Sequence, residues 1–147
     1  MFELNEVLVP VDFSDASRSA FARALTLVSG EAPAIILQHV IDPSFAELAE
    51  AYGLGSGAEL LSRMRERARR ELEAMAASAG TNVQVTPVIS EGVPFYEIVR
   101  GAEEFDVDAV IIERTGVEHH AEALFFGSTA ERVARACARP VIVLPAI

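Results

Sequence analysis

The sequence predicts an α/β protein with one doubly wound, five-stranded parallel sheet and helices on both faces. Short apolar, β-branched runs alternate with longer amphipathic segments, which is typical of strands that alternate with helices. Two of these runs, at 35–37 and 107–112, are almost continuously apolar, as parallel strands buried on both faces are. Since crossovers between parallel strands are right-handed, we expect the strand order 3-2-1-4-5.

The first half of the chain should form two strands and two helices. Strands are expected over residues 7–11 and 34–40, and the helix between them should end at Gly30. Ser14 and Asp15 stand where a helix is capped. The longest helix is expected over residues 58–79, because apolar side chains recur along one stripe. Residues 44–57 should form an irregular surface excursion that contains a short helical turn at 45–51.

The second half should supply three strands and two helices, which makes four helices in all. Residues 83–86 alternate as an edge strand should, and Pro87 suits an edge better than a sheet centre. Gly92 and Pro94 mark the start of the next helix. The remaining elements are a strand over 107–112, a helix from 127 to about 138, and a last strand over Val141–Leu144.

Composition narrows the class of protein. The chain has 147 residues, is 51% hydrophobic and lacks a run of eighteen apolar residues, so we expect one domain, 1–147, that does not enter a membrane. No leader-like segment precedes the first strand, which favours the cytoplasm. The net charge of -10 argues against nucleic acid as a partner. All twelve basic residues are arginine, which excludes a Walker lysine and Schiff-base chemistry. The single cysteine, Cys137, should be a small core residue.

A ligand crevice is expected where strands one and four lie side by side. In the order 3-2-1-4-5 the loops after these strands open at the topological switch point, so Asp12 and Glu113 should lie close together. Downstream, Ser128 and Glu131 have the spacing of a capping box. The helix that begins there could bind an anion with its free N–H groups, or Ser128 could simply cap it.

Several segments resemble the universal stress protein family. VLVPVDFSDAS at 7–17 is similar to the start of that family, and QHVID at 38–42 is similar to the end of its second strand. The resemblance continues through GVP at 92–94, DAVII at 108–112, GS at 127–128, ERV at 131–133 and PVIVL at 140–144. Only residues 44–58 lie outside it.

The resemblance implies an adenine-nucleotide crevice. Nucleotide-binding members of the family resemble G-x2-G-x9-G-[ST], with adenine and ribose at the first and second strand ends and phosphates at the glycine loop. The implied cofactor-binding positions in this chain are Pro10, Val11, Asp12, Val40, Ile112, Glu113, Gly116, Gly127, Ser128 and Thr129. The chain departs from the pattern in three ways: Glu113 replaces the first glycine, ten residues instead of nine separate Gly116 from Gly127, and His119 and His120 occupy the loop.

Glu113 should weaken the binding of ATP. Two unit charges about 4 Å apart repel by roughly 4 kcal/mol at an effective dielectric near 20. Arg114, a divalent cation or a turn of the side chain into solvent would offset part of this. We therefore expect a dimeric stress-response protein with a degenerate crevice, weak or absent ATP binding and an unidentified regulatory partner. The alternative is a sensor of ATP or another adenine nucleotide, bound with or without magnesium in the same crevice.

Three further expectations concern individual residues and the last strand. Asp12 is either a ribose or metal contact, by the resemblance, or an ordinary carboxylate near the next helix. We expect no metal site, because adjacent histidines such as His119 and His120 lack ligand spacing. We also expect no enzyme, because no nucleophile and base stand at a recognisable spacing. Family members dimerise through the last strand, which implies a homodimer through Val141–Leu144.

Overall fold

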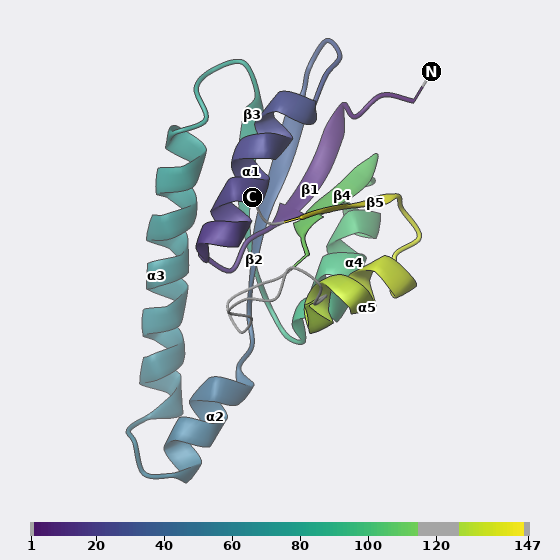
Figure 1. Cartoon of the computed structure of the whole chain (residues 1–147). Coiled ribbons are helices and arrows are strands. Elements are labelled where there is room, and N and C mark those ends of the chain that lie inside the picture. The colour runs from purple at the N-terminus through teal and green to yellow at the C-terminus, as the bar shows by residue number, and fades with distance from the viewer. Residues whose placement is uncertain (1, 115–126, 146–147) are drawn as a thin grey trace.

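A computed structural model describes residues 2–114 and 127–145 and confirms the predicted sheet. The elements are β1 (Glu6–Pro10), α1 (Asp15–Leu27), β2 (Ala34–Ile41), α2 (Ser44–Ala51), α3 (Gly57–Ala77), β3 (Gln84–Glu91), α4 (Pro94–Glu104), β4 (Ala109–Glu113), α5 (Ser128–Ala136) and β5 (Val141–Leu144). All neighbouring strands pair in parallel, in the order β3-β2-β1-β4-β5 (Figure 1). No helix within the described residues is long and apolar enough to cross a membrane.

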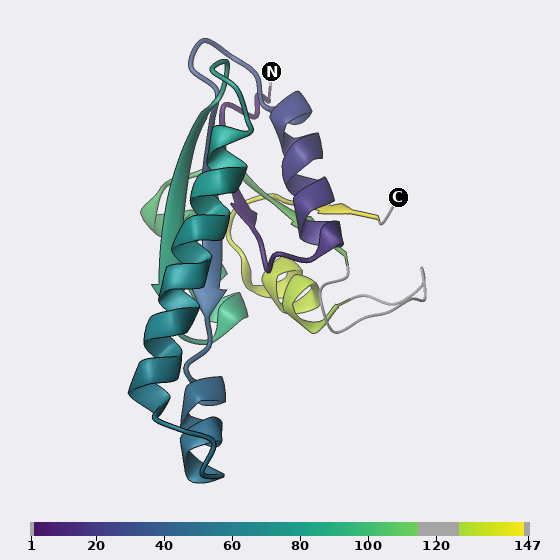
Figure 2. The same ribbon diagram turned by 90° about the vertical axis from the view of Figure 1, so that its left-hand side faces the viewer.

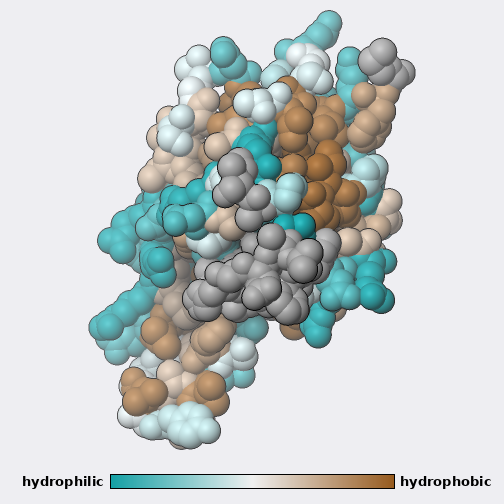
Figure 3. All heavy atoms as spheres, in the orientation of Figure 1, coloured by the Kyte–Doolittle hydropathy of each residue, from teal (hydrophilic) through white to brown (hydrophobic). Residues whose placement is uncertain are grey.

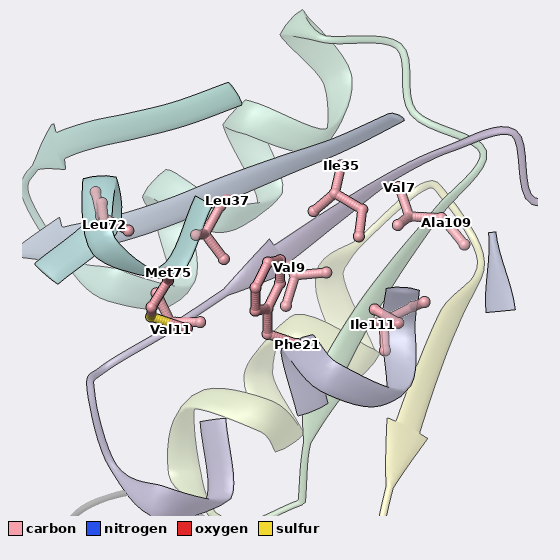
Figure 4. Close-up of a cluster of buried hydrophobic side chains, with 11 residues drawn as sticks. Val7, Val9, Val11, Phe21, Ile35, Leu37, Leu72, Met75, Ala109 and Ile111 are labelled. Atoms are coloured by element: carbon pink, nitrogen blue, oxygen red, sulfur yellow. The ribbon is translucent and has the colours of Figure 1, made fainter. Parts of the chain in front are cut away.

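Two hydrophobic clusters fix the helices to opposite faces of the sheet. Successive strand side chains point to opposite faces, so Val7 and Val9 lie on one face of β1 and Leu8 on the other. The first cluster joins the sheet to α1 and α3 through Phe21 and Leu72 (Figure 4). The second joins it to α4 and α5. Burial of each large side chain contributes about 1.5–3 kcal/mol, and both clusters lie directly beneath the carboxyl ends of the strands.

The segment between β2 and α3 is more regular than the sequence predicts. The helical turn expected at 45–51 is a full helix, α2, which raises the number of helices from the predicted four to five. This helix packs on α3 because Gly57 leaves room for the backbone: a Cβ there would lie 3.0 Å from the Ala46 carbonyl oxygen. Glu50 Oε1 also accepts a hydrogen bond of 3.2 Å from the Gly57 amide. Figure 2 shows this helical hairpin extending beyond the sheet.

The outer side of the hairpin is apolar. Its large exposed side chains are Phe45, Leu48, Tyr52 and Leu54. Gly53 and Gly55, which have φ angles of 72° and 116°, make the turn into α3. The glycines at 53, 55 and 57, which follow α2 closely, indicate a loop, which explains why the sequence predicts a short turn where an eight-residue helix forms.

The open edge formed by β3 bears out the interpretation of Pro87. The strand is longer than predicted and pairs only with β2, so it is an edge. The amides of Gln84 and Gly92 donate to the β2 side, to Pro33 and Ile41. Because strand amides alternate in direction, the amide position of Pro87 points outward, where no ladder hydrogen bond is lost. Cys137 packs, partly buried, against the cluster under α4 and α5, in line with its expected core role.

A buried amide lies beneath α4. Gln38, only 1% exposed, donates from Nε2 to the Glu97 carbonyl oxygen at 3.1 Å and to Ser90 Oγ at 3.0 Å. Gly101 lets α4 approach this side chain closely. A Cβ on Gly101 would lie 3.2 Å from Gln38 Nε2 and 3.3 Å from Leu8 Cδ1. The helix that borders the crevice is therefore positioned by a contact that only glycine permits.

Gly101→Ala should destabilise the protein. Overpacking costs about 1–3 kcal/mol, and the better helix propensity of alanine returns about 1 kcal/mol, so we expect a net loss of about 1 kcal/mol in urea unfolding. In a Gln38→Ala background the added methyl has room, and the penalty should disappear. Equal penalties in both backgrounds would show that the Gln38 contact does not set the position of α4.

Candidate functional site

A cavity of about 510 Å³ lies at the carboxyl ends of β1, β2 and β4, within the range of small-molecule sites. Helices α2, α3, α4 and α5 contribute the remaining walls. Eight of the ten predicted binding positions line it: Pro10, Val11, Asp12, Val40, Ile112, Glu113, Gly127 and Thr129. Ser128 is not among the lining residues, and Gly116 lies outside the described residues. Asp12 and Glu113 thus both line one cavity, as the loops after β1 and β4 face the same crevice.

The loop after β1 is held in a strained shape at the cavity. Phe13 has φ 66°, a left-handed conformation that costs on the order of 1 kcal/mol or more without glycine. Asp12 Oδ1 accepts a hydrogen bond of 3.0 Å from the Ser14 amide. The Ser14 hydroxyl in turn caps α1 by accepting from the Ser17 amide at 3.1 Å, as predicted. Asp12 therefore does form part of the helix start, and its contact with a ribose stays a prediction.

His39 supports this loop from β2. Its ring stacks on Phe13 with centroids 4.3 Å apart, and Nδ1 lies 2.7 Å from the Val11 carbonyl oxygen. Since a carbonyl accepts, Nδ1 must carry the proton. Burial lowers the pKa of His39, although the bond to Val11 and the charge of Asp12 raise it; Arg67 lowers it further. A pKa below the ordinary value of 6.5 leaves the ring neutral at pH 7.

The Glu113 side chain lies where the sequence analysis did not expect it. Its carboxylate is 3% exposed and faces α1, where Arg23 Nη2 lies 3.2 Å from Oε2. Arg23 also donates to the Pro145 carbonyl oxygen at 2.6 Å. The carboxylate therefore does not turn to solvent: Arg23 is its ion-pair partner, and the charge of Arg114 offsets a further part of its cost, as expected. The repulsion expected between an unpaired Glu113 charge and a phosphate about 4 Å away therefore does not apply.

Burial still dominates the titration of Glu113. Desolvation raises the pKa of its carboxyl group, while the charge and hydrogen bond of Arg23 and the charge of Arg114 lower it without full compensation. The ion pair with Arg23 thus offsets part of the cost of burying the Glu113 carboxylate.

The start of α5 corrects the predicted capping box. Gly127, not Ser128, is the N-cap, and no side chain caps the helix there. Glu131 instead pairs with Arg135 at 2.9 Å. The Gly127 amide donates to the Arg114 carbonyl oxygen at 2.6 Å, which joins the end of β4 to the helix. The positive end of α5 therefore borders the cavity next to Arg114.

Unpaired buried polar atoms gather at this cavity. Across the described residues, the buried side-chain atoms without a hydrogen-bond partner are Gln38 Oε1, Glu113 Oε1, Arg114 Nε and Arg23 Nε. The first three belong to lining residues, and the fourth belongs to the ion-pair partner of Glu113. Native proteins leave few such atoms, and those that persist call for an explanation such as a functional site.

Sequence reasoning did not single out four side chains of the site, Phe13, Arg23, Gln38 and His39, and it named Arg114 only as a partner of Glu113. The resemblance spans the first, third and fourth of these, so the conserved-looking segments were the available signal. Nothing local in the sequence points to Arg23, which is ninety residues from Glu113. No group of three or more potential metal ligands occurs between residues 2 and 114 or between 127 and 145, and His119 and His120 lie outside these ranges.

Comparisons with known proteins agree on one family. The model of the universal stress protein family matches residues 3–145. Two universal stress proteins of Methanocaldococcus jannaschii, MJ0531 and MJ0577, are 30% and 29% identical to the chain, each over 95% of it and over 81% and 93% of their own lengths. The solved structure of MJ0577 has a TM-score of 0.83 and covers 98% of this chain and 97% of its own.

Two more distant structures of the same fold hold adenine mononucleotides. One is a universal stress protein in complex with cAMP, with 24% identity and a TM-score of 0.59 over 97% of this chain and 98% of its own. The other, from Archaeoglobus fulgidus, is in complex with dAMP, with 20% identity and a TM-score of 0.57 over the same shares.

Arg23→Met should make stability strongly dependent on pH. A raised carboxyl pKa means that Glu113 contributes stability that is fully present below its unfolded pKa and lost as pH rises through its folded pKa. Removal of Arg23 raises the folded pKa further, so the loss should reach about 3 kcal/mol at pH 8 and be much smaller near pH 4.5, measured by urea unfolding. Adding Glu113→Gln should restore most of it.

The matched control is Arg135→Met, which breaks the exposed pair with Glu131. It should cost about 0.5 kcal/mol or less at either pH. A loss for Arg23→Met that does not change between the two pH values would contradict a buried ion pair.

Proposed function

Because this chain belongs to the universal stress protein family, we propose that it is a dimeric stress-response protein that binds an adenine nucleotide in the cavity at the ends of β1, β2 and β4. The observation that carries the proposal is the coincidence of that cavity with the topological switch point, where doubly wound sheets bind ligands. Eight positions that the resemblance assigns to nucleotide binding line it.

The chemistry of the walls suits the parts of a nucleotide. Pro10, Val40, Pro94 and Ile98 offer apolar surface for a planar base. Asp12 offers a carboxylate for ribose hydroxyls, and α5 offers its positive end to phosphate. The relatives in complex with cAMP and dAMP hold ligands of this class within the same fold.

The position of Glu113 favours nucleotide binding over a crevice that has lost its ligand. Its carboxylate is paired with Arg23 on the α1 face, so it does not compete with a phosphate on the opposite side of β4. We propose no catalytic residue. The Ser14 hydroxyl, which hydrogen bonds to Asp12, is committed to capping α1 and is not an available nucleophile.

Dimerisation would occur at β5. Its four residues, all apolar, are only partly buried, and Figure 3 shows an extended hydrophobic area on that side of the molecule. The amides of Val110 and Arg114 donate to Pro140 and Leu144, so the backbone groups of Val143 point to the open edge. A second copy of the chain would form hydrogen bonds with these backbone groups. It would also cover the apolar edge, which favours aggregation when it is left open.

Nucleotide binding is tested by mass spectrometry of natively purified protein and by calorimetric titration with adenine nucleotides, with and without magnesium. We expect binding by the wild type and less than about a threefold change in affinity for Glu113→Gln, whose charge is already paired. Asp12→Asn removes a charge of equal size from within the cavity and should weaken binding roughly tenfold. An empty protein that gives no heat with any adenine nucleotide would refute the function.

Val143→Pro should produce a monomer. Proline removes an outward amide without loss of a hydrogen bond to β4, so the fold should persist by circular dichroism. Ile89→Pro makes the equivalent change on the other edge, in β3, and should leave the oligomeric state unaltered in sedimentation velocity. A wild type that sediments as a monomer at micromolar concentration, or a dimer that survives Val143→Pro, would count against this interface.

A further inference from the structure

We infer that Arg114 is the phosphate-recognising residue of the cavity and that the cavity selects a nucleotide with one phosphate group over a triphosphate. The inference rests on the nucleotide-binding function proposed above, and it adds both a residue and a ligand class. Arg114 is separate from the positions that the resemblance assigns, which pass from Glu113 directly to Gly116.

The register of β4 directs Arg114 toward α5. Ile112 packs in the cluster under α4 and α5, and Glu113 turns to the opposite face, where it meets Arg23 of α1. The Arg114 amide continues the ladder by donating to Leu144 at 2.9 Å. Since strand side chains alternate, Arg114 returns to the α5 face. It lines the cavity there together with Gly127 and Thr129.

Arg114 differs from most arginines of the chain because it forms no ion pair within the part of the chain that the structure describes. Eight of the twelve arginines form ion pairs: Arg18, Arg23, Arg63, Arg65, Arg69, Arg100, Arg135 and Arg139. Arg114 forms none with the described residues, and its Nε is buried without a hydrogen-bond partner. A buried donor without a partner is costly, and a bound phosphate would satisfy it through a charge-assisted bond.

Arg67, the other arginine that lines the cavity, adds positive charge there but not on the α5 side, where the phosphate would bind. Arg67 projects from the exposed face of α3 and lies 5.9 Å from the centroid of the Phe13 ring. It is on the α1 and α3 side of the sheet, whereas α5, whose positive end borders the cavity, is on the other side. Arg114 and the start of α5 are therefore adjacent in a way that Arg67 and α5 are not.

The available positive charge matches one phosphate group. On the α5 side, the described residues supply one unit from Arg114 and about half a unit from the start of α5, while Arg67 lies on the α1 and α3 side. The next arginine in the sequence, Arg132, lies 5.2 Å from the Phe95 ring, and the chain has no lysine. Asp12 and Asp42 also line the cavity and would repel further phosphates. A phosphate monoester, with nearly two negative charges at neutral pH, is thus better balanced than a triphosphate.

The experiment is calorimetric titration of wild type, Arg114→Gln and Arg63→Gln with AMP, ATP and adenosine, without magnesium. Arg63 is the matched control, because it is an exposed arginine paired with Glu59 that does not line the cavity. In the wild type, AMP should bind more tightly than ATP. Arg114→Gln should weaken AMP binding about ten- to a hundredfold and change adenosine binding less than about twofold. Arg63→Gln should change neither.

Arg114→Lys separates charge from geometry. It keeps the positive charge but loses the planar fork, so its affinity for AMP should fall between those of the wild type and Arg114→Gln. Urea unfolding midpoints show whether each variant is folded. If Arg114→Gln does not fold, the comparison of Arg114→Lys with the wild type carries the test.

The outcomes distinguish this inference from the proposed function. Equal AMP affinity in wild type and Arg114→Gln, or ATP bound more tightly than AMP by the wild type, would overturn the inference and leave nucleotide binding intact. If no adenine compound binds, inorganic phosphate observed by ³¹P NMR is the remaining probe. If the wild type broadens the phosphate line and Arg114→Gln does not, Arg114 binds an anion even though the protein binds no nucleotide. Absence of broadening would overturn both proposals.

Discussion

The site depends on how β1 pairs with its two neighbours. With β2 it forms a ladder along its whole length, from Glu6 to Pro10, but with β4 only Val7 and Leu8 are paired. At the amino end the two strands are tied, because the Asp108 carboxylate accepts hydrogen bonds from the Asn5 and Glu6 amides at 3.0 and 2.9 Å. Beyond Leu8 they separate, and the cavity occupies the space that the missing ladder leaves open. The apolar run before β4 is interrupted by Asp108 for this reason.

Backbone strain and buried polar atoms without hydrogen-bond partners occur where β1 and β4 separate. Elsewhere in the described residues, local sequence and structure agree. Phe13, which is left-handed, and Gln38, whose Oε1 is buried without a partner, line the cavity; the unpaired Oε1 of Glu113 lies beside them at the end of β4, on the α1 face. Two packed clusters beneath it supply the stability that tolerates these defects. The many arginine and glutamate pairs along α3 contribute little by comparison, because they are exposed to solvent. The fold is therefore least optimised for stability at the site where a ligand is expected.

The sequence predicts the sheet well because strand order depends on patterns that are local. Continuous apolar runs, an edge proline at Pro87 and alternation with amphipathic helices each carry their own signal. It predicts α2 only as a short turn because three glycines close to its carboxyl end suggest a loop, although its outer face is apolar. It misplaces the cap of α5 because Gly127 already makes the turn, so Ser128 enters the helix. Period-two alternation does place Glu113 on the face of Ile111, but only the three-dimensional structure brings Arg23 to it.

The placement of Glu113 changes how a charged residue in a glycine-rich binding motif is interpreted. A glutamate at such a position adds a like charge to the site only if its side chain projects toward the ligand. Here the strand directs Glu113 to the opposite face, where an arginine from α1 balances it, and the same alternation directs Arg114 to the ligand side. The protein carries a net charge of -10, yet the end of β4 holds two arginines against one carboxylate. The charge that a ligand meets is therefore set by the pleat of a single strand and not by the composition of the motif or of the chain.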